Sequence, residues 1–269
     1  MSFLDTVLPE IRASLDRIGS AGPAATDPRP SRPARSLAAA VRGAPGGWAI
    51  LLEHKRRSPG AADPELPSEG PAVFVRRAEA AGADALSCLA TSPSFGGSVE
   101  DVRAVAAAAT RPVLCKDLVI DPRQIAAARH AGADAILLIA RLEQEGRTAV
   151  PLRRLAEEAS RAGLEVLLEF HAPEELKLAD EVPAAMWGVN LRDLGSLAFR
   201  PDVVRETARR LAGRGPFLGL SGVEGPEGAR RWRSWGAGGI LVGTGFARAR
   251  DPVAFVRELR AAAVKEGPG

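Results

Sequence analysis

The sequence predicts a closed barrel in which eight parallel strands alternate with eight helices, the (β/α)8 class. At 269 residues the chain has the length of one such domain. Its composition, 46% hydrophobic and 26% charged, supplies a sizeable core and excludes wholesale disorder. From residue 48 onward, short apolar runs alternate with amphipathic segments rich in Ala, Arg and Glu, and this alternation is typical of parallel strands joined by crossover helices.

Eight apolar runs are the expected strands. They are WAILLE (48–53), DALSCLA (84–90), PVLCK (112–116), DAILLIA (134–140), LEVLLEF (164–170), MWGVN (186–190), FLGLS (217–221) and GILVG (239–243). Eight strand–helix units in about 220 residues favour a closed barrel over an open doubly wound sheet. A dinucleotide-binding sheet is further disfavoured because no G-x-G-x-x-G follows the first run.

Glycine-containing motifs separate the expected helices from the following strands. The sequence AGAD occurs at 81–84 and 131–134, and the related WGAGG lies at 235–239. A glycine at each of these places fits the residue that ends a helix. The fold class is therefore a single (β/α)8 TIM barrel.

A helical extension precedes the barrel. Apolar residues recur at helical spacing from Phe3 to Ile18 among charged residues, which predicts an amphipathic helix. Residues 20–36 are rich in Pro, Ala and Ser and predict a poorly ordered connector. We therefore expect residues 1–47 to form an N-terminal helix and flexible loop that pack on the barrel, and residues 48–269 to form the catalytic domain.

Charge and cysteine content limit the function classes. A net charge of +3 and a pI near 9.3 suit an anionic ligand, whereas the absence of a long Lys/Arg run argues against nucleic-acid binding. No apolar run reaches the roughly 18 residues of a membrane span, and the N-terminus lacks signal-peptide features, so we expect a cytoplasmic protein with no membrane partner. Cys88 and Cys115 lie in apolar runs and predict buried free thiols.

Charged side chains stand at the carboxyl ends of the expected strands, where barrels of this class carry their active sites. Glu53 and Lys55 stand at the end of the first run, Lys116 and Asp117 at the end of the third and Glu169 at the end of the fifth, and the polar Asn190 ends the sixth. Strand alternation places each of these charged groups except Asp117 on the same face as an inward leucine. Two carboxylates and two ammonium groups are therefore expected to converge on one mouth.

Each of these residues also has a purely structural interpretation. Residues 55–57 could be a solvated charge run, and Glu169 could form a structural pair with Lys116. Asn190, taken alone, fits a turn residue.

The histidines do not form a metal site by sequence. His171 follows the fifth run and is expected to orient a loop rather than to perform chemistry. His54 should point toward the helices, and His130 lies near a helix end. Neither has neighbours at metal-ligand spacing, so no metal site is expected.

Two glycine-rich strand ends predict a phosphate site. LSG (220–222) and VGTG (242–245) follow the seventh and eighth runs. Small residues and free backbone N–H groups after these two strands form the usual phosphate-binding site of such barrels.

These motifs together resemble the indole-3-glycerol-phosphate synthase family. LLEHKRRSP (51–59) matches the E-x-K-R-x-S-P signature of that family, and GVNLRDL (188–194) matches its N-x-R-D motif. The likeness covers essentially the whole barrel and extends through 86–102, 112–125, 163–176, 221–223 and 240–252.

The resemblance implies ring closure of 1-(2-carboxyphenylamino)-1-deoxyribulose 5-phosphate with loss of carbon dioxide and water. By this resemblance Lys116 is the general acid, and Lys55 lies near the phosphate and the departing hydroxyl. Glu169 is the base or proton shuttle, and Glu53 and Asn190 hold the substrate and Lys116 in place. These groups can supply the proton transfers that the reaction needs.

The remaining site residues also follow from the resemblance. Arg192 and Ser58 would hold the anthranilate carboxylate, for which a planar guanidinium is suited. Phe95, Pro59 and Leu118 would flank the ring, and the phosphate would be bound by Ser221, Gly222, Gly243 and Thr244 together with Lys55. No cofactor is implied. The partner is a small phosphorylated substrate, and the chain is expected to be a monomer or weak homodimer.

Three positions depart from the family pattern. Leu220 stands where the family usually has Glu, and Ala90 and Leu118 stand where it usually has Thr and Phe. Leu220 should face the barrel mouth and Ala90 and Leu118 should lie near the ring end of the pocket. The hypothesis is that phosphate binding is retained while rate or substrate preference differs.

Other phosphate-binding barrels fit the sequence less well. The isomerase of the same pathway should have Cys at the end of the first strand and Asp at the sixth, where Glu53 and Asn190 stand. A Schiff-base aldolase should have Lys at the sixth. Two alternatives stay open: a diverged paralogue acting on a modified anthranilate derivative, and a non-catalytic phosphate-binding or regulatory barrel. The retained Lys116 and Glu169 argue against the second.

Overall fold

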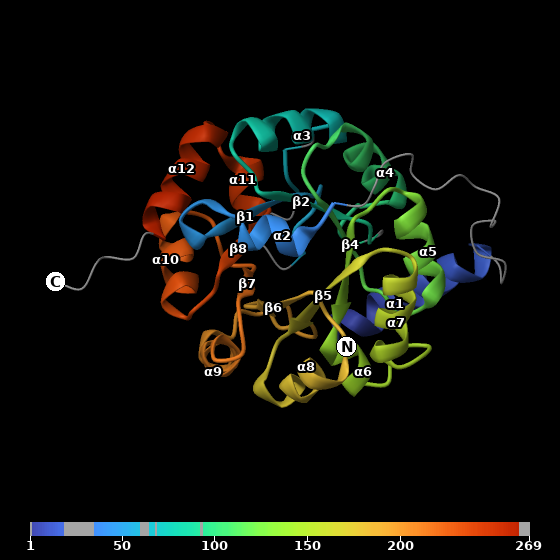
Figure 1. Ribbon diagram of the computed structural model, residues 1–269. Coiled ribbons are helices and arrows are strands. Elements are labelled where there is room, and N and C mark those ends of the chain that lie inside the picture. Colours follow the sequence, from blue (N-terminus) through green and yellow to red (C-terminus); the bar gives the residue numbers. More distant parts are fainter. Residues whose placement is uncertain (1, 19–34, 60–64, 68, 92–93, 264–269) are drawn as a thin grey trace.

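The computed structural model describes residues 2–18, 35–59, 65–67, 69–91 and 94–263. Eight parallel strands form a closed barrel in sequence order, and helices surround it (Figure 1). The strands are β1 (Ala49–His54), β2 (Ala85–Leu89), β3 (Val113–Lys116), β4 (Ala135–Ile139), β5 (Glu165–Phe170), β6 (Met186–Asn190), β7 (Phe217–Leu220) and β8 (Gly239–Val242). The predicted barrel is confirmed, and each strand lies within one residue of its predicted bounds at either end.

The crossover segments are helical as expected, but several contain a second short helix. Proline at the first turn begins many of them, since its missing N–H costs nothing there. The helices after β1 are α3 (Pro71–Ala80), α4 (Val99–Ala108), α5 (Pro122–His130), α6 (Ala140–Gln144), α7 (Leu152–Arg161), η2 (Pro173–Lys177), α8 (Leu178–Glu181), α9 (Pro201–Ala212), α10 (Pro226–Ser234), α11 (Thr244–Arg248) and α12 (Pro252–Ala262). The extra short helices follow β4, β5 and β8, at the carboxyl ends of the strands.

The AGAD motifs end helices and also fasten strands. One glycine in each of the three motifs adopts a left-handed φ angle, as expected for a residue that follows a helix: +92° at Gly82, +88° at Gly132 and +91° at Gly236. Asp84 then accepts a hydrogen bond of 2.8 Å from the N–H of Ile50, on the preceding strand. In the second copy, the aspartate accepts the N–H of Val113 at 2.9 Å. Each motif thus ties the start of one strand to the start of the strand before it.

The barrel separates two apolar cores. Inward residues such as Leu51, Leu114 and Leu167 fill the barrel interior. Their neighbours along the chain, such as Ile50 and Leu52, face the surrounding helices. Because side chains alternate along a strand, Glu53, Lys116 and Glu169 share the inner face with these leucines.

The N-terminal segment contributes to the inner core at both ends of the barrel. Apolar residues of α1 (Phe3–Ile18) and α2 (Leu37–Arg42) belong to the same buried cluster as the barrel interior. The backbone N–H of Phe3 bonds to Gly195, in the loop after β6, at 2.8 Å. Ser36 and the N–H of Ala38 bond to Glu165, at the start of β5. Thus α1 lies at the carboxyl end of the barrel and α2 at the amino end. The connector predicted at 20–36 falls mainly outside the described residues.

The cysteines and the helix lengths also agree with the sequence analysis. Cys88 and Cys115 are buried free thiols, as predicted, and burial raises the pKa of both. Among the described residues, no helix is long and apolar enough to cross a membrane.

Replacing Asp84 with alanine tests the strand-fastening role of the AGAD motif. The change leaves the buried N–H of Ile50 without its acceptor and removes the 2.9 Å contact to Arg260. We expect a loss of about 1–3 kcal/mol in the free energy of unfolding, the cost of an unsatisfied buried donor, measured by urea denaturation. Asp84→Asn keeps an acceptor and should lose less; equal losses in the two variants would contradict the proposed hydrogen bond.

Candidate active site

One cavity opens at the carboxyl ends of the strands, and every predicted site residue lines it. The space within its walls and open mouth is about 1020 Å³. The predicted residues at its wall are Glu53, Lys55, Ser58, Pro59, Phe95, Lys116, Leu118, Glu169, Asn190, Arg192, Leu220, Ser221, Gly222, Gly243 and Thr244. The structure therefore brings these residues together, and their individual roles stay predictions.

Glu53 lies between the two lysines of the site. One carboxylate oxygen is 3.4 Å from the Lys55 ammonium and the other is 3.8 Å from the Lys116 ammonium. Glu53 itself is only 5% exposed. Burial lowers the pKa of Lys55, and the nearby Lys116 adds to this effect while Glu53 opposes it. The arrangement fixes both ammonium groups at one side of the cavity.

Glu169 occupies the floor of the cavity and is 1% exposed. Its Oε1 accepts a hydrogen bond of 3.1 Å from the side-chain amide of Asn190 and lies 3.1 Å from Nε2 of His171. Burial would raise the pKa of Glu169, but contact with His171, the charge of Lys116 and the bond from Asn190 outweigh burial and lower it. The carboxylate is therefore ionised at neutral pH and can accept a proton.

The loop after β7 has a strained backbone that α10 holds in place. Ser221 and Gly222 adopt left-handed φ angles of +67° and +69°. The indole N–H of Trp232 donates to the Ser221 carbonyl at 3.0 Å, and the Arg231 guanidinium donates to the Gly222 carbonyl. Because C=O and N–H point in opposite directions across a trans peptide, the following N–H groups, of Gly222 and Val223, point away from α10. In the described part of the chain neither N–H has a hydrogen-bond acceptor, which suits an anion site.

Gly243, directly after β8, lies close to the side chains of Glu53 and Lys55. A Cβ atom there would lie 2.7 Å from Glu53 Oε1 and 2.7 Å from Lys55 Cε, so a larger residue would displace the ends of these two site side chains. The next residue, Thr244, has its hydroxyl 3.2 Å from that of Ser58. Ser58 therefore lies beside the expected phosphate site; its expected contact with the substrate carboxylate stays a prediction.

Aromatic residues form the rim. The Arg192 guanidinium lies 4.6 Å from the ring centre of Phe199 and donates to the Leu197 carbonyl at 2.8 Å. Phe3 of α1 meets Phe95 edge to face, with 5.9 Å between ring centres. Phe3 and Phe199 both line the cavity, and neither was predicted from the sequence.

One sequence-based placement is wrong. Ala90 was expected near the ring end of the pocket, but it belongs to the outer core and does not line the cavity. Its neighbours Leu89 and Thr91 do, because alternation along β2 and its extension turns Ala90 toward the helices. Leu118 and Leu220 do line the cavity, as expected.

Asp117 and Thr91 also line the cavity; Asp117 was expected at the strand end without a role, and Thr91 was not predicted. Asp117 accepts hydrogen bonds from Thr91 at 2.7 Å and from Gln124 at 2.9 Å. Burial raises the pKa of Asp117 despite these bonds. The position of Asp117 directly after Lys116 was the available signal, since both stand at a strand end.

Fold and site together define a (β/α)8-barrel protein with a cavity lined by ionisable side chains at the carboxyl ends of its strands. The indole-3-glycerol phosphate synthase family model matches residues 4–259. The chain therefore belongs to the indole-3-glycerol phosphate synthase family.

Curated relatives carry the same name. An indole-3-glycerol phosphate synthase from Nocardioides sp. is 38% identical over 215 residues, covering 79% of this chain and 80% of the relative. Indole-3-glycerol phosphate synthase 2 from Streptomyces coelicolor is 37% identical and covers 84% of this chain and 85% of the relative.

Solved structures show the same fold at low identity. Phosphoribosyl anthranilate isomerase from Thermococcus kodakaraensis is 15% identical with a TM-score of 0.60, covering 82% of this chain and 100% of that one. Thiamine phosphate pyrophosphorylase from Pyrococcus furiosus is 17% identical with a TM-score of 0.57, covering 81% and 96%. At these identities the likeness concerns the barrel alone.

Arg231→Met tests whether α10 holds an anion-binding loop. Without the guanidinium, the Gly222 carbonyl loses its charged donor, and the strained loop is free to relax. We expect the dissociation constant for inorganic phosphate to rise about tenfold, consistent with the ~1.5 kcal/mol of such a bond, as measured by titration calorimetry. Arg233→Met, on the same helix but bonded to Gly47, is the control, and equal affinity in both variants would refute the role of Arg231.

Proposed function

We propose that this chain is an indole-3-glycerol phosphate synthase, a carboxy-lyase of tryptophan biosynthesis. It would close the indole ring of 1-(2-carboxyphenylamino)-1-deoxyribulose 5-phosphate with loss of carbon dioxide and water. The observation that carries the proposal is the convergence of Lys116, Lys55, Glu53 and Glu169 on one cavity that also has two glycine-rich loops. Family membership supports the same reaction.

Lys116 is the proposed general acid. Ring closure requires a proton donor at the ketone oxygen, so that the carbonyl carbon becomes more electrophilic. The Lys116 side chain is 18% exposed, and its ammonium group lies 3.8 Å from Glu53. This contact orients the ammonium group toward the cavity. Lys55, 3.4 Å from the other oxygen of Glu53, is placed to contact the phosphate and the departing hydroxyl.

Glu169 is the proposed base or proton shuttle. After ring closure, loss of carbon dioxide restores the benzene ring. The hydroxyl on the former ketone carbon then leaves as water, and the neighbouring carbon, next to the nitrogen, must give up a proton to complete the indole. A buried carboxylate that stays ionised at neutral pH is suited to accept it. Asn190, which donates to Glu169 at 3.1 Å, fixes the carboxylate and contacts the substrate.

The two ends of the substrate are bound by different loops. Ser221, Gly222, Gly243 and Thr244 are proposed to hold the phosphate, with N–H groups available in the β7 loop. Arg192 and Ser58 are proposed to hold the carboxylate that is lost. Phe95, Pro59 and Leu118 are proposed to flank the ring. The proposed reaction uses these residues alone, in a cytoplasmic monomer or weak homodimer.

Lys116→Met tests the reaction and the acid together. We expect turnover to fall by about 10²- to 10⁴-fold, the usual contribution of a general acid, measured by the fluorescence of the indole product. Lys177→Met, at an exposed position of η2, is the matched control and should keep full activity. Binding of the substrate without turnover in the unmodified protein would contradict the proposed activity.

Leu220→Glu tests the departure at the end of β7. Leu220 is 1% exposed and lines the cavity, so a carboxylate there would face the substrate. On the hypothesis that the missing acidic group limits the rate, kcat should rise while the KM for substrate stays similar. Leu220→Gln has the same size without the charge and is the control. An unchanged or lower kcat in Leu220→Glu would show that leucine is no handicap.

A further inference from the structure

A line of charges of alternating sign begins at Glu169 and leads away from the cavity. His171 lies 3.1 Å from Glu169 by its Nε2 and 3.7 Å from Glu175 by its Nδ1. Glu175 also accepts the backbone N–H of His171 at 2.7 Å and the Nε–H of Arg141 at 2.7 Å. Arg141 lies 3.7 Å from Asp193. The order of charges is therefore negative, positive, negative, positive, negative, if His171 is an imidazolium.

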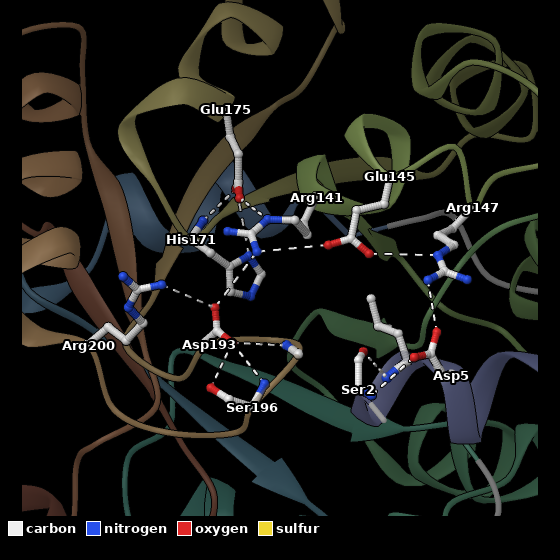
Figure 2. Close-up of polar contacts among 12 residues, drawn as sticks. Ser2, Asp5, Arg141, Glu145, Arg147, His171, Glu175, Asp193, Ser196 and Arg200 are labelled. Atoms are coloured by element: carbon white, nitrogen blue, oxygen red, sulfur yellow. Dashed lines mark hydrogen bonds and ion pairs between the residues drawn. The ribbon is translucent and has the colours of Figure 1, made fainter.

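Figure 2 shows that this line extends to α1. Arg141 also lies 3.9 Å from Glu145, whose other oxygen is 3.7 Å from Arg147. Arg147 donates to Asp5 of α1 at 2.9 Å. A continuous series of ion pairs and hydrogen bonds thus connects β5, η2, α6 and α1.

The His171 ring and the two carboxylates beside it are buried, and this burial bears on the charge of the ring. His171 is 3% exposed, and Glu169 and Glu175 are 1% and 0% exposed. Two ionised carboxylates in such surroundings need a positive partner. Each ring nitrogen of His171 has a carboxylate oxygen as a neighbour, 3.1 Å from Nε2 and 3.7 Å from Nδ1, so a positive charge on the ring would be stabilised from both sides.

The local charges favour the imidazolium. Burial alone would lower the pKa of His171, but its contacts with Glu169 and Glu175 outweigh burial and raise it to about 9. The same contacts lower the pKa of both carboxyls against the opposite effect of burial. The other charged groups facing this cluster are Lys116 from β3 and Arg141 from α6.

We propose that His171 is a positioning residue that, as a buried imidazolium clamped by Glu175 and Arg141, holds the carboxylate of Glu169 ionised and aimed at the cavity. This role rests on the proposed function, because it assigns to Glu169 the task of accepting a proton. His171 does not line the cavity and acts only through Glu169.

The alternative is that His171 merely fills space. A filler would matter for stability and leave the ionisation of Glu169 unchanged. The two interpretations therefore differ in the pH dependence of the reaction.

His171→Gln removes the charge and keeps an amide donor that can reach Glu169. Because a neighbouring cation lowers the pKa of a carboxyl, its loss raises that pKa. We expect the acidic limb of the kcat/KM profile to move up by about 1–3 pH units, with turnover retained on the alkaline side of that limb. His130→Gln, at the other end of the barrel on α5, is the matched control and should leave the profile unshifted. An active His171→Gln variant with an unshifted limb would overturn the proposal.

Histidine ring NMR on the unmodified protein provides a second test that needs neither folding of the variant nor turnover. The chain has three histidines, so His130→Gln and His54→Gln spectra assign the remaining ring. The His171 ring should remain protonated at both nitrogens at pH 7.5 and lose a proton only near pH 9. A neutral ring at pH 7.5 would overturn the proposal. Absence of turnover in the unmodified protein, by contrast, would refute the proposed function while this titration still decides the charge of His171.

Discussion

The structure depends on one constraint: closing eight parallel strands directs every second side chain of each strand toward a common axis. Within the barrel this volume is filled by leucine and alanine, as at Leu51, Leu114 and Leu167. One step further along the same strands, the inward positions hold Glu53, Lys116 and Glu169. The geometry that packs the interior thus also brings ionisable groups from distant parts of the sequence within a few ångströms.

Such groups are tolerated because they are paired in opposite signs. Desolvating an isolated carboxylate or ammonium is costly, and the cost falls when an opposite charge shares the low-dielectric space. Glu53 is placed between two ammonium groups, and Glu169 faces an imidazole, a lysine charge and an amide. The two carboxylates thus have different surroundings, so that one can orient cations while the other remains available for a proton.

Sequence patterns predicted the barrel and the strand-end residues of the cavity because both follow from local rules. The resemblance to the family supplied the other predicted lining residues, Ser58, Pro59, Phe95, Leu118 and Arg192. The two-residue period assigned Glu53 and Lys116 to the inner face, and the AGAD motifs marked helix ends. The resemblance places Ala90 near the ring, but the two-residue period along β2 turns its side chain toward the helices. The His171–Glu175–Arg141 arrangement could not be predicted, because it joins side chains of a loop and two short helices whose directions are set by tertiary packing. The place of Phe3 at the cavity could not be predicted for the same reason. Phe3 contacts Phe95, and tertiary packing brings together these two segments, which lie far apart in the sequence.

The N-terminal helix is best understood as part of the site. Phe3 lines the cavity, its backbone N–H holds the loop after β6 through Gly195, and Asp5 ends the line of charges that begins at Glu169. That same loop includes Asp193, which accepts bonds from Ser196 and the N–H of Gly195 and lies near Arg141. A displacement of α1 would therefore alter both the aromatic rim and the outer anchor of the charges that orient Glu169. Helix α1 thus contributes Phe3 to the wall of the cavity and, through Asp5, supports the outer end of the alternating charges.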